Sequence, residues 1–422
     1  MKKKHFTAAL TMSAIMLGIA GCANSTGNST TAAQTEVSNT AAEESTETAS
    51  EENEDVETTE TNLIESPDIY DGMTEDEITA LKMAMDEILK KNPFGLVYNG
   101  AIAENAEGAV NIRPVTYHNP QGIQLVANLY LPSGYDENGS YPAVVVAHPN
   151  GGVKEQVSGL FAQKLAENGY ITIAFDAAYQ GASGGTPRNM DLPASRVEDI
   201  RSAIDYLSGV AGVDTTRIGA LGICGGGGYT IEASKRDKRI SAVATISMFN
   251  SGRVRRNGLG DGDIDGIQGR REQAAEARAN YAANGEVDYV GSLVTHRTEY
   301  TEEQLSQMPA GLYRDGAQYY GDTHFHPHSQ GRYTAMSLMD LMAFDVEDQA
   351  DLIDQPLLMM TGDVSDTRYM TEGVFEKATG TDDKELVLIP GAQHIETYWK
   401  DEYVKQETDK LVEFFGTKLA TE

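Results

Sequence analysis

Short buried strands alternate with helical segments between residues 143 and 246, and this alternation is the strongest constraint on the fold. Apolar runs rich in β-branched residues occupy positions 143–147, 171–175, 218–221 and 240–246, and helical patterns lie between them. Continuous apolar strands are typical of a parallel sheet that is covered on both faces. The alternation therefore predicts right-handed βαβ units and a doubly wound, mostly parallel α/β sheet.

The pattern stops after residue 247 and resumes beyond residue 352. Further strands are expected at 356–361 and 385–389, and the segment between the two blocks is rich in Gly, Arg, Tyr and His. The strands on either side of this segment complete one pattern. We therefore interpret 111–247 and 353–422 as one core with a sheet of about eight strands, and 248–352 as a helical or irregular lid inserted over it.

The first 62 residues predict a leader and a spacer. Lys2, Lys3 and Lys4 precede a short apolar stretch, which is the pattern of a signal peptide over residues 1–21. Cys22 follows small residues as in a bacterial lipobox, so a lipid on Cys22 is expected to anchor the protein on the extracytoplasmic face of the cell membrane. Residues 22–62 contain ten acidic residues and no Lys or Arg, which predicts a disordered tether.

Residues 63–110 are expected to form an N-terminal helical extension. Thr74 is a suitable N-cap, acidic residues follow it, and apolar residues recur at helical spacing up to Lys91. The core then begins with a hairpin, because two strand-like runs flank the turn sequence at 119–122.

Charge and cysteine content exclude two classes of protein. The formal net charge is −31, whereas a nucleic-acid binder needs clustered Lys and Arg. The chain has two cysteines, Cys22 and Cys224, so it is not a disulfide-stapled scaffold. Each cysteine therefore needs its own explanation.

Cys224 lies in the sequence Gly222-Ile223-Cys224-Gly225-Gly226, after a strand and at the start of a helix. This is the nucleophile-elbow pattern, with sulfur in place of oxygen. The glycines permit a sharp turn that projects the side chain above the sheet. We expect the helix N-terminus to lower the pKa of the thiol.

The partners of a nucleophile in this position follow in the order acid, then histidine. His394 is the single histidine after the resumed sheet, which predicts that it is the base. The acid is expected in the loop after the preceding strand, where both Asp363 and Asp366 qualify and Asp366 is favoured. For the oxyanion hole we expect two backbone donors, the N–H of Gly225 and an N–H from residues 150–152. Within that range Gly151 is the favoured donor. His148 is expected to brace that loop.

These residues together resemble the α/β-hydrolase superfamily, in particular its dienelactone-hydrolase-like branch with a cysteine at the elbow. The resemblance covers residues 110–247 and 353–420. It implies hydrolysis of a carboxylic ester, thioester or lactone of a small molecule through an acyl-cysteine, with no metal and no organic cofactor. Because of the large lid, the resemblance does not determine the substrate, so an acyltransferase or a peptidase with the same triad is an alternative. Another alternative is a catalytically silent lipoprotein that binds a ligand.

Three weaker patterns lie in the lid. Residues 261–272 satisfy the EF-hand loop expression without an entering helix, so an acidic lid loop is the better interpretation. Residues 324–328 (His-Phe-His-Pro-His) are a poor chelate, and we expect them to line or cover the pocket. Arg253, Arg255 and Arg256 could bind an anionic group or could simply pair with carboxylates. The sequence leaves the oligomeric state open.

Overall fold

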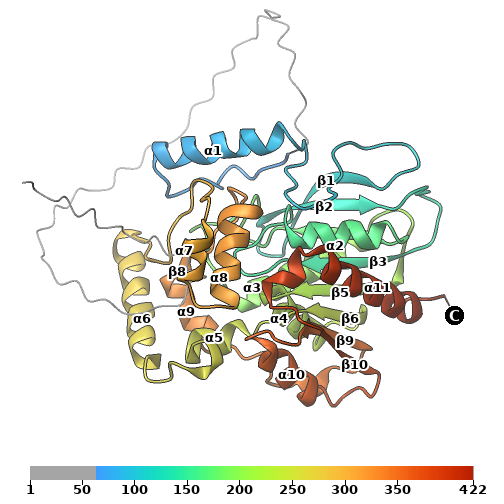
Figure 1. The fold of residues 1–422 in the computed structure, drawn as a ribbon. Helices are drawn as coiled ribbons and strands as arrows, with labels where there is room; N and C mark the ends of the chain where they lie inside the picture. Colours follow the sequence, from blue (N-terminus) through green and yellow to red (C-terminus); the bar gives the residue numbers. More distant parts are fainter. Residues whose placement is uncertain (1–62, 422) are drawn as a thin grey trace, which may run out of the picture.

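A computed structural model describes residues 63–421, and its centre is an eight-stranded mixed sheet (Figure 1). The strand order is β1-β2-β4-β3-β5-β6-β9-β10. β1 and β2 form an antiparallel hairpin, and β2 pairs antiparallel with β4. All other neighbours are parallel. The predicted mostly parallel, doubly wound sheet is confirmed.

Most strand bounds agree with the expected ones to within a few residues. The strands are β1 (Asn111–His118), β2 (Gln124–Leu131), β3 (Tyr141–Ala147), β4 (Ile171–Phe175), β5 (Val213–Ile223), β6 (Ile240–Ile246), β9 (Leu357–Gly362) and β10 (Lys384–Ile389). β3, β4, β5, β6 and β9 carry the continuous buried runs expected of strands with both faces covered.

Helices cover both faces of the sheet. They are α2 (Val157–Ala166), α3 (Pro193–Ser208), α4 (Gly225–Ser234), α10 (Arg368–Lys377) and α11 (Asp401–Lys418). The ring of Phe415 in α11 approaches β5 at Gly219, whereas α4 approaches it at Gly222. Positions three apart in a strand point to opposite faces. α11, together with its neighbour α2, therefore lies across the sheet from α4 and its neighbour α3.

The N-terminal extension contains the expected helix, α1 (Glu75–Leu89). Thr74 caps it in a reciprocal capping box with Glu77. The stretch before α1 is tied to the core, since the N–H of Ser66 donates to the carbonyl of Ala182 at 2.9 Å and Asp68 accepts from the N–H of Gly185 at 2.7 Å.

The segment between β6 and β9 forms a cap at one side of the sheet (Figure 1). Its elements are α5 (Ser251–Asn257), α6 (Ile267–Asn284), β7 (Tyr289–Val290), α7 (Glu302–Ser306), α8 (Leu312–Gln318), a π-helical turn (Tyr319–Thr323), β8 (Tyr333–Thr334) and α9 (Leu338–Leu341). α6, β7, β8 and α9 share a small apolar cluster of their own, separate from the main core. Apart from α6, each of these elements is too short to show periodicity in the sequence.

Within residues 63–421, no helix is both long and apolar enough to span a bilayer. The expected signal peptide, the lipidation site Cys22 and the acidic tether lie outside the described residues.

Candidate active site

Cys224 occupies a tight turn between β5 and α4. Its φ and ψ are 55° and −122°, in a region that non-glycine residues rarely adopt. A Cβ atom at Gly222 would lie 2.5 Å from the carbonyl oxygen of Gly226, so the two arms of the turn approach too closely for any side chain there. The expected elbow is present, and the strained backbone holds the thiol at the carboxyl end of the central strand.

Two backbone N–H groups donate to the Cys224 sulfur, those of Gly225 and Asn150. Gly225 is one of the two expected donors, and Asn150 takes the place expected for Gly151. The chain turns between Pro149 and Gly152, and the carbonyl of Gly151 accepts a hydrogen bond from Ser329 of the lid at 2.7 Å. This turn presents the N–H of Asn150 to the thiol.

The Asn150 side chain also fixes the position of the second donor. A Cβ at Gly225 would lie 2.1 Å from Asn150 Oδ1, so only glycine fits beside it. Asn150 Nδ2 in turn donates to Ser251 Oγ at 2.8 Å, at the start of α5. The loop after β3, the elbow and the first lid helix are thereby joined.

His394 is fully buried and its ring contacts two hydroxyl groups. Nδ1 is 2.5 Å from Thr367 Oγ1, and Nε2 is 2.8 Å from the hydroxyl of Tyr398. Tyr398 is also hydrogen-bonded to the Cys224 thiol. The hydroxyl of Tyr398 therefore links the imidazole of His394 to the thiol of Cys224.

Neither candidate aspartate contacts His394, which corrects the expected triad geometry. Asp366 Oδ2 accepts from the N–H of Leu312 in the lid at 3.0 Å. Asp363 Oδ1 accepts from the N–H of Gly391 at 2.6 Å. The loop brings its next residue, Thr367, inward, so the Asp366 side chain points to the lid instead.

Comparison with known proteins assigns this chain to a family. The model of the "Dienelactone hydrolase family" matches residues 127–250. Protein YcjY of Escherichia coli K12, described as uncharacterized, is 36% identical over 307 residues, which are 72% of this chain and 97% of YcjY. The chain belongs to the dienelactone hydrolase family of α/β hydrolases.

Two further proteins are similar to this member of the family. The crystal structure of hypothetical protein PA2218 of Pseudomonas aeruginosa superposes with a TM-score of 0.66 at 32% identity, covering 75% of this chain and 96% of that one. The thiohydrolase aneE of Aspergillus aculeatus is 34% identical over 125 residues, which are 30% of this chain and 38% of the fungal protein. The first confirms the α/β-hydrolase fold over most of the described residues.

The charge state of this dienelactone-hydrolase-family site differs from the expected one. Burial raises the pKa of the Cys224 thiol, although the hydrogen bonds from Tyr398, Gly225 and Asn150 act in the opposite direction. Burial also lowers the pKa of His394 to about 3. At neutral pH the site therefore holds a thiol and a neutral imidazole. The expected lowering of the thiol pKa is wrong, because desolvation by burial outweighs these hydrogen bonds.

Sequence reasoning missed Thr367, Tyr398 and Tyr320. Tyr398 lies four residues after His394, at the end of the 3₁₀ turn Ile395–Tyr398. Tyr320 lies in the π-helical turn of the lid, and its buried hydroxyl interacts electrostatically with Cys224. Tyr398 is close to His394 in the sequence, whereas the positions of the other two depend on how distant loops meet.

His148 braces the loop after β3, as expected. Its Nδ1 is 2.7 Å from the carbonyl of Pro149, and its Nε2 accepts from the N–H of Ala177 at 3.0 Å. Burial lowers its pKa to about 3, so it is neutral.

The lid histidines cover the core beside the extension. His328 Nε2 is 3.1 Å from a carboxylate oxygen of Glu65, and the rings of His326 and His328 meet edge to face. Across residues 63–421 no group of three or more His, Cys, Asp or Glu side chains is placed to hold a metal ion. In the EF-hand-like loop, Asp261 and Asp263 pair with Arg253 and Arg270.

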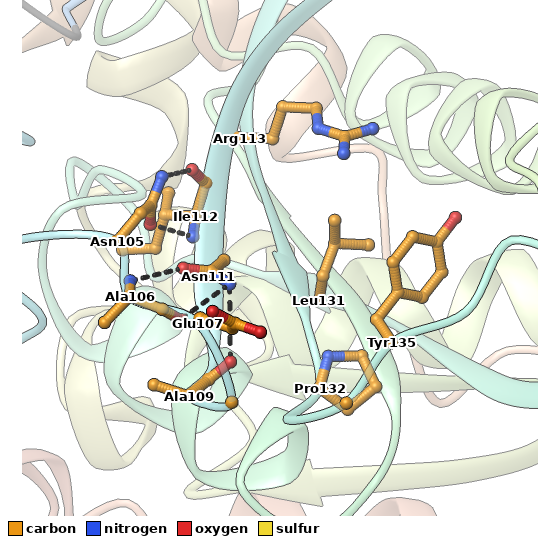
Figure 2. Close-up of a pocket in the computed structure, with 12 residues that line it drawn as sticks. Asn105, Ala106, Glu107, Ala109, Asn111, Ile112, Arg113, Leu131, Pro132 and Tyr135 are labelled. Carbon is orange, nitrogen blue, oxygen red and sulfur yellow. Dashed lines mark hydrogen bonds between the residues drawn. The ribbon is translucent and has the colours of Figure 1, made fainter.

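Cys224 and His394 are 5% and 0% exposed, so both side chains are shielded from solvent. A surface cavity of about 660 Å³ lies elsewhere, between the first strand and the loop that carries Tyr135 (Figure 2). Asn105 closes one side of it through two hydrogen bonds to the backbone of Ile112. This cavity lies at the amino ends of the parallel strands, at the opposite edge of the sheet from the Cys224 thiol.

Proposed function

We propose that this chain is a lipid-anchored, extracytoplasmic hydrolase that cleaves a carboxylic ester, thioester or lactone through an acyl-cysteine. The observation that carries the proposal is the strained elbow at Cys224, with the N–H groups of Gly225 and Asn150 directed at its sulfur. Two such donors beside a nucleophile stabilise the oxyanion of acyl transfer.

Acylation begins with a thiol and a neutral imidazole. The Cys224 proton passes to the Tyr398 oxygen as the Tyr398 proton passes to His394 Nε2, and the sulfur attacks the substrate carbonyl carbon. The two N–H groups hold the oxyanion. His394 then returns its proton along the same path to the leaving alkoxide or thiolate, and a thioester to Cys224 remains.

Deacylation uses the same groups in reverse. A water molecule attacks the thioester carbonyl while His394 accepts its proton, and the sulfur leaves as a thiol. Nδ1–H of His394 donates to Thr367 Oγ1 throughout, which fixes the tautomer in which Nε2 is the base. Thr367 is therefore a positioning residue.

The family and one relative support this choice of reaction. Dienelactone hydrolase family membership favours hydrolysis of a small molecule, and a thioester is among the bonds considered because the relative aneE is described as a thiohydrolase. That relative matches less than half of its own length, so the substrate class remains part of the proposal.

The test is to trap the acyl-enzyme. Wild-type protein mixed briefly with 4-nitrophenyl butyrate and quenched in acid should carry one butyryl group on the peptide that contains Cys224. Cys224→Ala should carry none and should release no nitrophenol above background. Turnover that survives in Cys224→Ala would refute the proposal, and a wild type that is never acylated would favour the silent ligand-binding protein.

Hydrolysis, transfer and peptide cleavage are separated by products and substrates. Added glycerol, amines or thiols should leave butyrate as the main product of a hydrolase, whereas an acyltransferase would form the corresponding adduct. A peptidase would prefer acyl-peptide anilides to esters of the same acyl group.

The membrane anchor is tested separately. Full-length protein expressed in a bacterium should fractionate with the membrane and incorporate labelled fatty acid, and Cys22→Ala should abolish the labelling. Equal labelling of the two proteins would refute lipidation at Cys22.

A further inference from the structure

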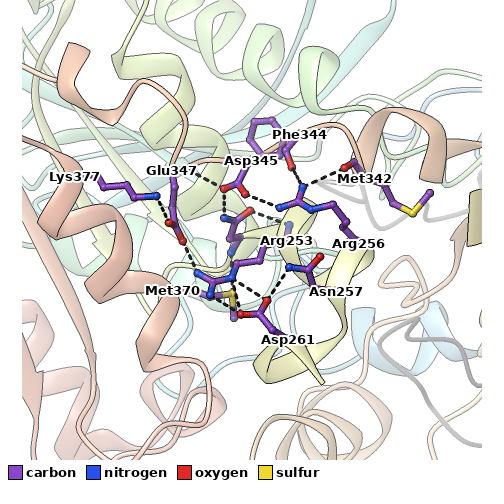
Figure 3. A network of polar contacts seen from close by, with 11 residues as sticks. Arg253, Arg256, Asn257, Asp261, Met342, Phe344, Asp345, Glu347, Met370 and Lys377 are labelled. Atoms are coloured by element: carbon purple, nitrogen blue, oxygen red, sulfur yellow. Dashed lines mark hydrogen bonds and ion pairs between the residues drawn. The ribbon is translucent and has the colours of Figure 1, made fainter. Parts of the chain in front are cut away.

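Ion pairs hold the lid to the core at its first helix, α5 (Figure 3). Arg253 pairs with Asp261 at 2.5 Å and with Glu347 at 2.6 Å, and Arg256 pairs with Asp345 at 2.7 Å. These two arginines are occupied by carboxylates of the protein itself, so they fix the lid in place.

The arginine between them is held by an aromatic ring. The guanidinium of Arg255 packs 4.7 Å over the ring of Tyr333. Aromatic contacts also hold the part of the lid that follows the π-helical turn, and a cavity lies beside that part.

His324, the first residue after the π-helical turn, belongs to a series of stacked rings. Its imidazole lies 4.3 Å from the ring of Tyr319, at an interplanar angle of 14°, and 5.5 Å from the ring of Trp399. Tyr319 in turn meets the ring of Tyr398 edge to face at 5.5 Å. The same Tyr398 hydroxyl is 2.8 Å from His394 Nε2, so these rings connect the lid to the proposed base.

A cavity of about 500 Å³ opens beside His324 and Trp399. Tyr98 of the N-terminal extension lines it from the other side. Its volume lies within the range of small-molecule sites. Among the described residues that line it, Cys224 and His394 are absent, so its occupant is not the group that reacts at the thiol.

The imidazole of His324 presents a hydrogen-bond acceptor to this cavity. Thr323 Oγ1 is 3.3 Å from the carbonyl oxygen of Gln318 and 2.8 Å from His324 Nδ1. Both contacts are hydrogen bonds only if the threonine hydroxyl donates to the carbonyl and Nδ1–H donates to the hydroxyl. Burial lowers the pKa of His324 to about 4, so the ring is neutral and Nε2 carries no proton. No residue of the described chain donates to Nε2.

The charges around the cavity cancel. Lys164 and Lys405 line it together with Asp401 and Asp409. Lys405 pairs with Asp409 at 2.6 Å, and Lys164 pairs with Glu167 at 2.9 Å. Because each lysine already has a carboxylate partner, the cavity favours an uncharged ligand over an anion or a cation.

We propose that this cavity is a second binding site, for an uncharged aromatic ring that carries a hydroxyl group, as in a phenol. The ring packs between Trp399 and Tyr98, and its hydroxyl donates to His324 Nε2. The inference does not depend on the proposed acyl-cysteine chemistry, since neither the thiol nor the base takes part in binding.

The first test uses Trp399, which is the single tryptophan of the chain and therefore reports on this cavity alone. Phenol and anisole share one ring, but only phenol donates a hydrogen bond. Each is titrated into the full chain, and the tryptophan is excited where neither ligand absorbs. The dissociation constant should be roughly threefold to tenfold lower for phenol. An unchanged fluorescence with phenol, or equal constants for the two ligands, would overturn the proposal.

Variants of His324 test the acceptor. His324→Phe and His324→Asn both remove Nε2, and the asparagine keeps an amide that can donate to Thr323. Both should bind phenol no better than anisole, whereas His296→Gln, at an exposed histidine of the lid, should keep the wild-type preference. Anisole needs no acceptor, so its binding shows that a variant is folded. A preference for phenol that persists in the folded variants would contradict the assigned role of His324.

Charge and location are tested on the wild-type protein. Benzoate, which is negatively charged, should bind more weakly than phenol, and tighter binding of benzoate would overturn the assignment of an uncharged ligand. Protein alkylated at Cys224 with iodoacetamide should bind phenol with an unchanged dissociation constant. Loss of phenol binding on alkylation would place the ligand at the thiol and overturn the second site. Failure of 4-nitrophenyl butyrate to acylate Cys224 would refute the hydrolase and leave this site standing.

Discussion

The proposed site has a nucleophile side, where Cys224, Gly225 and Asn150 are positioned by the backbone. On its base side, His394, Thr367 and Tyr398 are connected by side-chain hydroxyl groups. The first side depends on a strained turn and on glycines that no other residue could replace. The second side depends on two hydrogen bonds, of 2.5 and 2.8 Å, to a ring that has no carboxylate partner. The position of the proposed nucleophile is therefore set by local chain geometry, whereas the position of the proposed base is set by packing between distant loops.

The largest effect is expected on the nucleophile side. Cys224→Ala should lower kcat/KM for activated esters by about 10⁴-fold or more, since it removes the group that forms the covalent intermediate. Far-ultraviolet circular dichroism and the thermal midpoint should remain close to those of wild type. A smaller loss would mean that the backbone donors alone carry the reaction.

On the base side, the next largest effect is expected at Tyr398. Tyr398→Phe breaks the only hydrogen-bonded path seen between Cys224 and His394 in the described chain, and it should lower kcat by roughly 10²-fold. The matched control is Tyr403→Phe, a change at the outer part of α11, which should have no effect. Wild-type activity in Tyr398→Phe would show that His394 takes the thiol proton directly, and the two sides would then be less different than described.

Acid should destabilise both sides in the same way. Burial lowers the pKa of His148 on the nucleophile side and of His394 on the base side to about 3. Between about pH 6.5 and pH 3 the unfolded chain therefore binds protons at these positions that the folded chain does not, and the free energy of unfolding falls as pH falls, by about 1.4 kcal/mol per pH unit and histidine.

Urea unfolding at several pH values measures this slope. His394→Gln should reduce the slope by about one proton, and His118→Gln, at an exposed position, should leave it unchanged. A slope that is the same in wild type and His394→Gln would show that His394 is not held neutral by burial.

The smallest effects distinguish Thr367 from Asp366. Thr367→Val removes one hydrogen bond to His394 and should lower kcat by roughly twofold to tenfold, with a changed pH profile. Asp366→Asn should change kcat by less than this, because its side chain can still accept from the N–H of Leu312. A larger loss in Asp366→Asn than in Thr367→Val would mean that the carboxylate turns to His394 during catalysis.

Thr367→Asp sharpens the same comparison. A carboxylate beside Nδ1 should raise the pKa of His394, so the activity of this variant should decrease at a higher pH on the acid side than that of wild type. Identical acid limbs in the two proteins would show that position 367 does not face the imidazole in solution.

The sequence by itself determined the sheet and the turn that carries Cys224. Uninterrupted apolar strands such as β4 and β6 are buried on both faces wherever the fold places them, so their period and bounds could be predicted to the residue. The elbow could be recognised at Gly222-Ile223-Cys224-Gly225-Gly226 because the strain and its relief by glycine lie within five consecutive residues.

Only the tertiary structure decided the partners of His394, the charge state of the thiol and the different roles of three neighbouring arginines. Which of Asp363, Asp366 and Thr367 meets the imidazole depends on how one loop rotates against another. Whether the thiol ionises depends on desolvation by the lid, which no local motif encodes. Arg253, Arg255 and Arg256 are the same residue type within four positions of the sequence. Their ion pairing differs because carboxylates distant in the chain approach only Arg253 and Arg256.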